Sequence, residues 1–242
     1  MMRMIKTRMI ALVLALTVLA TPALSRAQDG PWVDALLVMA IDASASVSQT
    51  VLEGQLEGHA GAFRDPLVHN ALQSGFYGRI GVAVMLWSNP TDTNLVIPWR
   101  VLESAEDAMT LAADIDAIPR DERAGSTGLG AALAAGERHI RRAPFRSDRR
   151  IIDISSNGFN NIGPRPEFLK PALEVADIEV NAIVILDEYD WLKRYFAESV
   201  VVGTGAFVMP AGGVEDYADA ILRKLVRELS YNLWRGPVPH RS

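Results

Sequence analysis

Cysteine is absent from the 242-residue sequence, and basic residues are fewer than acidic ones. The lack of cysteine excludes disulfide scaffolds, thiolate nucleophiles and cysteine-ligated zinc sites. The 24 Lys and Arg against 29 Asp and Glu give a formal net charge of −5. Because nucleic-acid binding depends largely on phosphate neutralisation by basic side chains, an acidic chain is a poor candidate for it.

Long hydrophobic runs are confined to the N-terminus. Three basic residues in the first eight positions precede an apolar run from Met9 to Ala20, and small residues flank a possible cleavage position near Ala27. This order is typical of a secretory signal peptide. The run is shorter than the roughly 20 residues that a membrane helix needs, although a retained N-terminal anchor is the alternative. We therefore predict a signal peptide at residues 1–27 and a periplasmic or secreted protein without a stable membrane span.

Several catalytic motifs are also missing. The sequence has no Gly-x-Ser-x-Gly elbow, no phosphate-binding loop and no zinc-protease helix. Its four histidines (His59, His69, His139 and His240) show no metal-ligand spacing with one another. His59 lies in an apolar helical stripe, which favours a structural role.

Strand-like and helix-like segments alternate along the rest of the chain. Continuous apolar runs, typical of strands buried on both faces, occur at residues 35–41, 80–87, 150–154, 178–186 and 206–209. A segment at 94–99 predicts a short antiparallel return strand near an edge. Helical patterns beginning near Ser48 and spanning 105–118, 127–140 and 216–229 separate these strands. We predict an α/β fold with a doubly wound, mostly parallel central sheet, helices on both faces and one antiparallel edge strand.

This pattern predicts one domain at residues 28–233, followed by a C-terminal tail at 234–242.

In such open sheets, ligands bind at the rim where the strands end and the strand order reverses. The first strand ends there in Asp42-Ala43-Ser44-Ala45-Ser46, which places a carboxylate and two hydroxyls on one turn. Oxygen ligands suit hard divalent cations, while helix capping is the other explanation for this motif.

The motif Asp42-x-Ser44-x-Ser46 resembles the opening of the metal-ion-dependent adhesion site of von Willebrand factor type A domains. That resemblance implies a threonine from a later loop, for which Thr127 is the candidate. It also implies an aspartate after the fourth strand, but here Ser156-Asn157-Gly158 stands where the family usually has Thr-Asp-Gly. By resemblance, Ser44, Ser46 and Thr127 bind the metal, while Asp42 and Asn157 hold its waters.

The asparagine keeps an acceptor oxygen but removes one negative charge. The resemblance therefore implies Mg²⁺ or Mn²⁺ as the cofactor, bound weakly or not at all because of Asn157. Asp187 and Glu188 follow the next strand on the same rim and could compensate. Deamidation of Asn157 before Gly158 would regenerate the aspartate.

Further segments narrow the resemblance to a bacterial family of exported von Willebrand factor type A-like domains of unknown function. They are Trp87-Ser88 and residues 125–130, 158–161, 202–208 and 224–229, and the similarity spans about residues 32–230. At the shared rim, we predict partner contacts by Trp87, Ser88, Ser156 and Asp187; core burial is the alternative for Trp87.

We expect a binding or adhesion-type module. Its degenerate metal-ion-dependent adhesion site would recognise a protein partner through an acidic residue that completes the coordination of the cation. A metal-assisted hydrolase on the same rim is an alternative, but it needs a general base beside the metal, and Asp42 is already engaged. A structural envelope protein with a vestigial site is a third possibility.

Overall fold

The computed structural model describes residues 30–120 and 125–230. They form a six-stranded sheet of order β3-β2-β1-β4-β5-β6. The strands are β1 (Leu36–Asp42), β2 (Ile80–Trp87), β3 (Thr93–Leu102), β4 (Arg150–Ser156), β5 (Ile178–Ile185) and β6 (Val208–Ala211). The predicted signal peptide at 1–27 and the tail at 234–242 lie outside the described residues.

The central strands are buried because their sequences are apolar on both faces. Every residue of β1 and β2 is buried, and these strands pair in parallel with Leu36 opposite Gly81. All pairings are parallel except that of β2 with β3. The predicted mostly parallel sheet with one antiparallel edge strand is confirmed.

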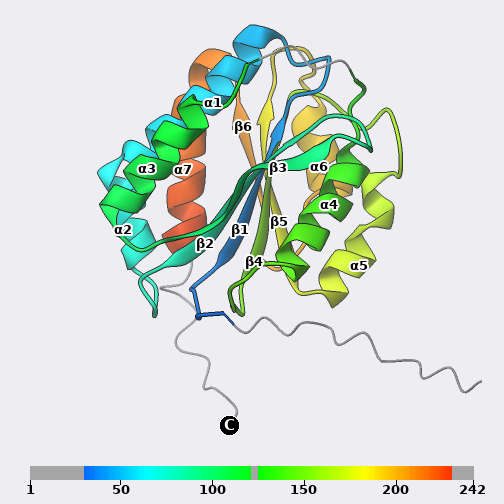
Figure 1. Ribbon diagram of the computed structural model, residues 1–242. Coiled ribbons are helices and arrows are strands. Elements are labelled where there is room, and N and C mark those ends of the chain that lie inside the picture. The colour runs from blue at the N-terminus through cyan, green and yellow to red at the C-terminus, as the bar shows by residue number, and fades with distance from the viewer. Residues whose placement is uncertain (1–29, 121–124, 231–242) are drawn as a thin grey trace, which may run out of the picture.

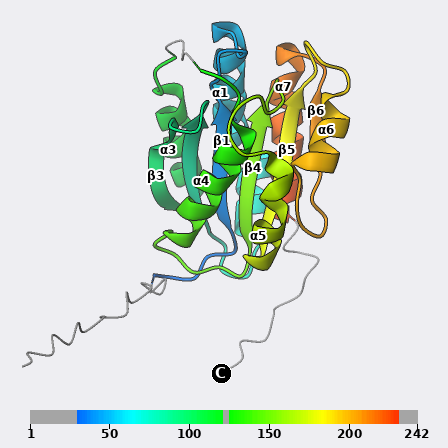
Figure 2. The same cartoon turned by 90° about the vertical axis from the view of Figure 1, so that its right-hand side faces the viewer.

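Two layers of helices cover the sheet (Figure 1). On one face lie α1 (Gln49–Arg64), α2 (Pro66–Gln73), α3 (Ala105–Asp116) and α7 (Tyr217–Ser230). On the other lie α4 (Leu129–Arg141), α5 (Lys170–Val175) and α6 (Leu192–Ser199), with α4 and α5 in front of the sheet in Figure 2. Short 3₁₀ turns, η1 (Pro166–Phe168) and η2 (Val214–Asp216), precede α5 and α7. Among the described helices, none has both the length and the apolar character needed to cross a membrane.

The two edges of the sheet differ from its centre. At one edge, β3 is half-exposed, contains Pro98, and pairs with β2 through register shifts between Val82 and Met85. At the other edge, β6 has only four residues. The strand order reverses between β1 and β4, whose chains continue to α1 and α5 on opposite faces. The loops after these two strands therefore meet at the switch point of the sheet.

Several boundaries differ from the sequence prediction. Helix α4 begins at Leu129, after a Gly128 cap with non-helical backbone angles, rather than at Thr127. The last strand begins at Val208 rather than Ala206. Helices α2, α5 and α6 were not predicted, because they have only six to eight residues and show too few turns for a clear helical period.

Candidate metal centre

The candidate site lies at the switch point, where β1 ends in Asp42 and β4 ends in Ser156. Helix α1 takes Ser48 as its N-cap, and the Ser48 hydroxyl accepts a hydrogen bond from the Val51 amide at 3.3 Å. Because Ser48 fills the capping role, Ser44 and Ser46 are not needed for it. Helix capping therefore does not explain the two serines that precede Ser48.

Three hydroxyl oxygens converge above the strand ends, and we call them the hydroxyl triangle. The Ser44 and Ser46 oxygens lie 3.0 Å apart, Ser44 and Thr127 3.2 Å, and Ser46 and Thr127 3.4 Å. Ser44 and Thr127 are buried and Ser46 is exposed, so the triangle opens to solvent on the Ser46 side. The structure thus brings together residues that are 81 to 83 positions apart in sequence.

Asp42 lies beneath the triangle with both carboxylate oxygens engaged. Its Oδ1 accepts from the Ser44 amide at 2.8 Å, and its Oδ2 accepts from the Ser156 hydroxyl. Complete burial raises the pKa of Asp42 to about 6, although the hydrogen bonds from Ser156 and Ser44 act in the opposite direction. A buried carboxylate of this kind gains from a cation placed on the triangle.

Asn157 closes the other side of the site. Its Oδ1 accepts from the Ser46 hydroxyl at 3.4 Å, while its Nδ2 donates to the Ser46 carbonyl at 3.2 Å. Only the first contact is open to an ionised aspartate, since a carboxylate has no donor. The asparagine therefore holds the Ser46 turn in a way that the usual aspartate cannot.

The loop after β4 fixes Thr127 in place. The Asn161 side chain accepts from the Thr127 amide at 2.8 Å, and the Asn160 side chain accepts from the Gly130 amide at 3.2 Å. A Cβ at Gly158 would lie 3.3 Å from the Ser46 hydroxyl, which leaves room for a side chain only if Ser46 moves. The sequence Gly158-Phe159-Asn160-Asn161 thus shapes the site from beside it.

The donor set fits a small hard cation. Metal–oxygen distances of about 2.0–2.1 Å in an octahedron imply neighbouring oxygens about 3.0 Å apart, close to the edges of the hydroxyl triangle. The three hydroxyl oxygens are therefore spaced as one face of such an octahedron would be. Among the described residues, no group of three or more His, Asp or Glu side chains is placed to hold a metal ion. The oxygens that meet at the triangle are all hydroxyls.

The four residues predicted to contact a partner differ in their exposure. Asp187 is exposed, whereas Ser88 and Ser156 are buried, and Ser88 donates to Asp92 at 3.0 Å. Trp87 is fully buried and its indole donates to the Ala40 carbonyl at 3.1 Å. This arrangement corrects the expectation of a Trp87 surface contact and fits the alternative of a core tryptophan, because a side chain between two layers cannot reach a partner.

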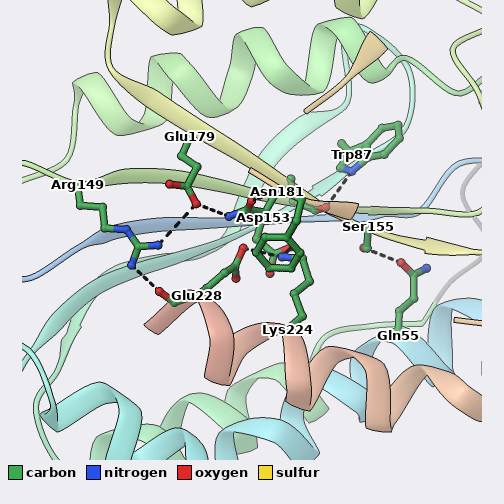
Figure 3. A network of polar contacts seen from close by, with 11 residues as sticks. Gln55, Trp87, Arg149, Asp153, Ser155, Glu179, Asn181, Lys224 and Glu228 are labelled. Carbon is green, nitrogen blue, oxygen red and sulfur yellow. Dashed lines mark hydrogen bonds and ion pairs between the residues drawn. The ribbon is translucent and has the colours of Figure 1, made fainter. Parts of the chain in front are cut away.

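Sequence reasoning missed a second polar group of residues, which Figure 3 shows between α7 and the sheet. Lys224 pairs with Asp153 and with Glu228, the latter at 2.7 Å, and all three side chains are at most 2% exposed. We call these three residues the ion cluster. Burial, with the charge of Asp153 as the next cause, raises the pKa of Glu228 to about 7.

Other polar residues extend the ion cluster toward the N-terminal end of β5 (Figure 3). Arg149 donates to the Glu228 carbonyl and lies 3.6 Å from Glu179. Asn181 donates to Glu179 at 2.7 Å and accepts from the Phe207 amide at 3.0 Å. These contacts connect α7 to the N-terminal ends of β4 and β5.

Gln55 of α1 links β1 and β4 between the two polar groups. Its amide donates to the Asp42 carbonyl at 3.0 Å and accepts from the Ser155 hydroxyl at 2.7 Å. The sequence did carry signals for these residues. Asp153 interrupts an apolar strand, and Lys224 and Glu228 fall four residues apart within the buried stripe of α7.

The family of the chain follows from its sequence. A family described as "Protein of unknown function (DUF1194)" matches residues 32–233. The chain belongs to the DUF1194 family. No curated protein matches the sequence.

Solved structures place this DUF1194 member in the von Willebrand factor type A fold. The mussel byssus proximal thread matrix protein 1, with a zinc-occupied metal-ion-dependent adhesion site, is similar with a TM-score of 0.61 at 18% identity; the match covers 83% of this chain and 49% of that one. The pilus adhesin SpaC from Lactobacillus rhamnosus GG gives 0.59 at 13% identity, covering 83% and 31%. The SpRpn10 VWA domain gives 0.51 at 11% identity, covering 78% and 94%.

This chain therefore spans about a third to a half of the adhesin and the thread protein. Identities this low establish the fold alone. The predicted von Willebrand factor type A-like architecture is thus confirmed, and the function has to be argued from the site.

Proposed function

We propose that this chain is an exported adhesion-type module that binds an acidic side chain of a protein partner through a divalent cation on the hydroxyl triangle. Ser44, Ser46 and Thr127 would hold Mg²⁺ or Mn²⁺, and Asp42 and Asn157 would accept hydrogen bonds from its waters. The bound cation would supply positive charge to a partner carboxylate. The observation that carries the proposal is the triangle, with oxygen separations of 3.0 to 3.4 Å above a buried carboxylate.

The charge of the site supports an acidic partner. The triangle is neutral, and Asp42 is the only carboxylate among the five candidate ligands, so a bound divalent cation keeps excess positive charge. A carboxylate from outside is then the natural missing ligand. The predicted signal peptide and the likeness to a pilus adhesin and a byssus protein support export to the periplasm or beyond.

Hydrolysis on the same rim is less well supported. A metal-assisted hydrolase needs a general base beside the cation. Asp42 has both oxygens occupied, by the Ser44 amide and the Ser156 hydroxyl. Because these two contacts and the role proposed for Asp42 in holding the waters of the cation already engage this carboxylate, it is not a free general base, and we favour binding over catalysis.

A metal-free rim is the second candidate, and Asn157 favours it. The donation from Asn157 Nδ2 to the Ser46 carbonyl closes the turn without a cation. In that case the chain is a structural envelope protein, or it binds its partner without metal.

Calorimetric titration of Mg²⁺ and Mn²⁺ into the mature protein tests the proposal. We expect saturable binding that is lost in Ser44→Ala, with Ser147→Ala, a buried serine outside the site, as the matched control. Asn157→Asp adds a charge near the cation and should tighten binding about tenfold or more, which corresponds to about 1.4 kcal/mol.

Heat from the parent that persists in Ser44→Ala would place the cation elsewhere and sink the proposal. Binding by Asn157→Asp alone would support the metal-free rim for the natural chain.

A further inference from the structure

An exposed group of aromatic rings lies beside the candidate site, and its role is not explained by the cation. Phe159, Tyr189, Trp191 and Tyr195 form this aromatic cluster, with ring centroids 5.2 to 6.2 Å apart. Phe159 is 37% exposed and Trp191 41% exposed. Exposed contiguous rings on a rim mark interaction surfaces, and Trp and Tyr are enriched among the residues that dominate binding.

The cluster is built into the loop that shapes the candidate site. Phe159 is two residues from Asn157, and the next amide, of Asn160, donates to the Tyr195 hydroxyl at 3.3 Å. The same loop holds Thr127 through Asn161. A partner that reached the hydroxyl triangle would therefore lie close to these rings.

Three exposed carboxylates are close neighbours of these rings in the sequence. Asp187, Glu188 and Asp190 occupy the five residues that end at Trp191, and all three are exposed. Glu188 accepts from the Tyr189 hydroxyl at 2.8 Å. A purely apolar partner would bury these charges unpaired, which is costly. An arginine can stack on an exposed ring and also pair with a carboxylate, which suits both features.

The rest of the molecule already uses this contact. The Arg165 guanidinium lies 5.5 Å from the centre of the Phe168 ring, and that of Arg227 lies 3.7 Å from the centre of the Phe207 ring. Over the described residues, no such arginine covers a ring of the aromatic cluster. The exposed part of Trp191 can therefore be reached by an arginine from outside.

We propose that the aromatic cluster, together with Asp187 and Asp190, binds an arginine side chain that the protein partner carries near its acidic residue. Recognition of the partner's acidic residue rests on the proposed function. Recognition of its arginine, which we call the basic half, rests on the aromatic cluster alone. The rim would thus read a pair of opposite charges rather than a single carboxylate. Such a pair gives specificity, because a partner with only one of the two charges leaves half of the surface unpaired.

The basic half is tested without any partner. Arginine amide is titrated into the mature protein while the Trp191 indole resonance is followed by NMR, with citrulline amide as the neutral isostere. We expect arginine to shift the resonance saturably, and citrulline to bind at least fivefold more weakly. Asp187→Asn should weaken arginine binding about threefold, and Phe76→Leu, an exposed ring outside the aromatic cluster, should leave it unchanged.

Short peptides with one Glu and one Arg, one to five residues apart, then test the pair in the presence of Mg²⁺. We expect the best spacing to lose about tenfold in affinity when Arg becomes citrulline. That loss should shrink to about threefold in Trp191→Leu, in which Asp187 and Asp190 remain.

The two hypotheses fail separately. Peptide binding that needs Glu and Ser44 but is indifferent to citrulline would overturn the arginine site and leave the proposed function standing. If arginine still binds in Ser44→Ala and the affinity of the peptides does not depend on their Glu, the proposed function is overturned and the arginine site stands. Absence of any arginine-dependent shift at Trp191 overturns the inference outright.

Discussion

The hydroxyl triangle and the ion cluster lie close to the same strand, yet they treat charge in opposite ways. Around the end of β4, near Ser156, the site gathers neutral hydroxyls over one buried carboxylate. Three residues earlier, Asp153 faces α7, where two carboxylates share Lys224 in the core. The first arrangement leaves room for a cation from solvent, whereas the second contains its own.

This difference separates binding from stability. Removing a hydroxyl from a half-open site leaves groups that water can satisfy, so the fold loses little. Removing one charge from a sealed cluster leaves others unpaired in low dielectric, which is costly. The chain therefore concentrates polar stabilisation under α7 and keeps the rim available for a ligand.

The strongest test of this comparison is Lys224→Met. Two buried carboxylates then lose Lys224, the cation that pairs with both, and we expect the free energy of unfolding to fall by about 3–5 kcal/mol. Urea denaturation measures the loss. The triple variant Lys224→Met, Asp153→Asn, Glu228→Gln should recover most of it, and failure to recover would show that packing of the lysine, not its charge, is what matters.

The pH dependence of the free energy of unfolding tests the same cluster through Glu228. Its folded-state pKa, about 7, lies above the ordinary 4.5, so its protonated form stabilises the fold below pH 4.5 and that stabilisation is lost as pH rises through 7. The stability of the parent relative to Glu228→Gln should therefore grow by up to about 3 kcal/mol as pH falls from 7 to 4.5.

His59 acts in the opposite sense in both proteins. Burial lowers its pKa to about 4 from 6.5, so stability is lost as pH falls through this range. Burial, the largest cause of the lowered His59 pKa, is common to the parent and Glu228→Gln, so most of its effect cancels in their difference; the charge of Glu228 contributes only the smallest of the named causes. Parallel stability curves for the two proteins would mean that Glu228 does not take up the proton.

Gln55 joins the two regions, so its loss should have an intermediate cost. Gln55→Leu leaves the Asp42 carbonyl and the Ser155 hydroxyl without their partner, and we expect about 1–3 kcal/mol of destabilisation. Gln49→Leu, at an exposed position of the same helix, is the matched control. Thermal or urea unfolding measures both, and equal effects would contradict a structural link through Gln55.

The smallest effect on the fold is expected at the rim. Ser46→Ala removes one exposed corner of the triangle and should change the free energy of unfolding by less than about 1 kcal/mol. Cation binding should nevertheless be lost. A large loss of stability would show that the triangle is part of the structural core, which would erase the contrast with the ion cluster.

Predictability from sequence differs between these regions for a physical reason. The strands were recognisable because residues such as those of β1 form unbroken apolar runs, and Asp42, Ser44 and Ser46 because they share one turn. The ion cluster could not be predicted in this way, because charged residues such as Asp153 and Lys224 are normally exposed. Only tertiary packing reveals that they neutralise each other. The aromatic cluster was missed because it joins two loops, at Phe159 and at Tyr189 to Tyr195, that no local period connects.

The edges of the sheet have a consequence for how copies of this chain can meet. An unpaired strand offers free amides and carbonyls to another molecule and so invites polymerisation. Pro98 removes one donor from β3, the irregular pairing of β3 with β2 distorts that edge, and β6 offers only four residues at the other. Both borders are thereby poor templates for strand addition, so a high local concentration would not join copies of this chain into fibres through these edges.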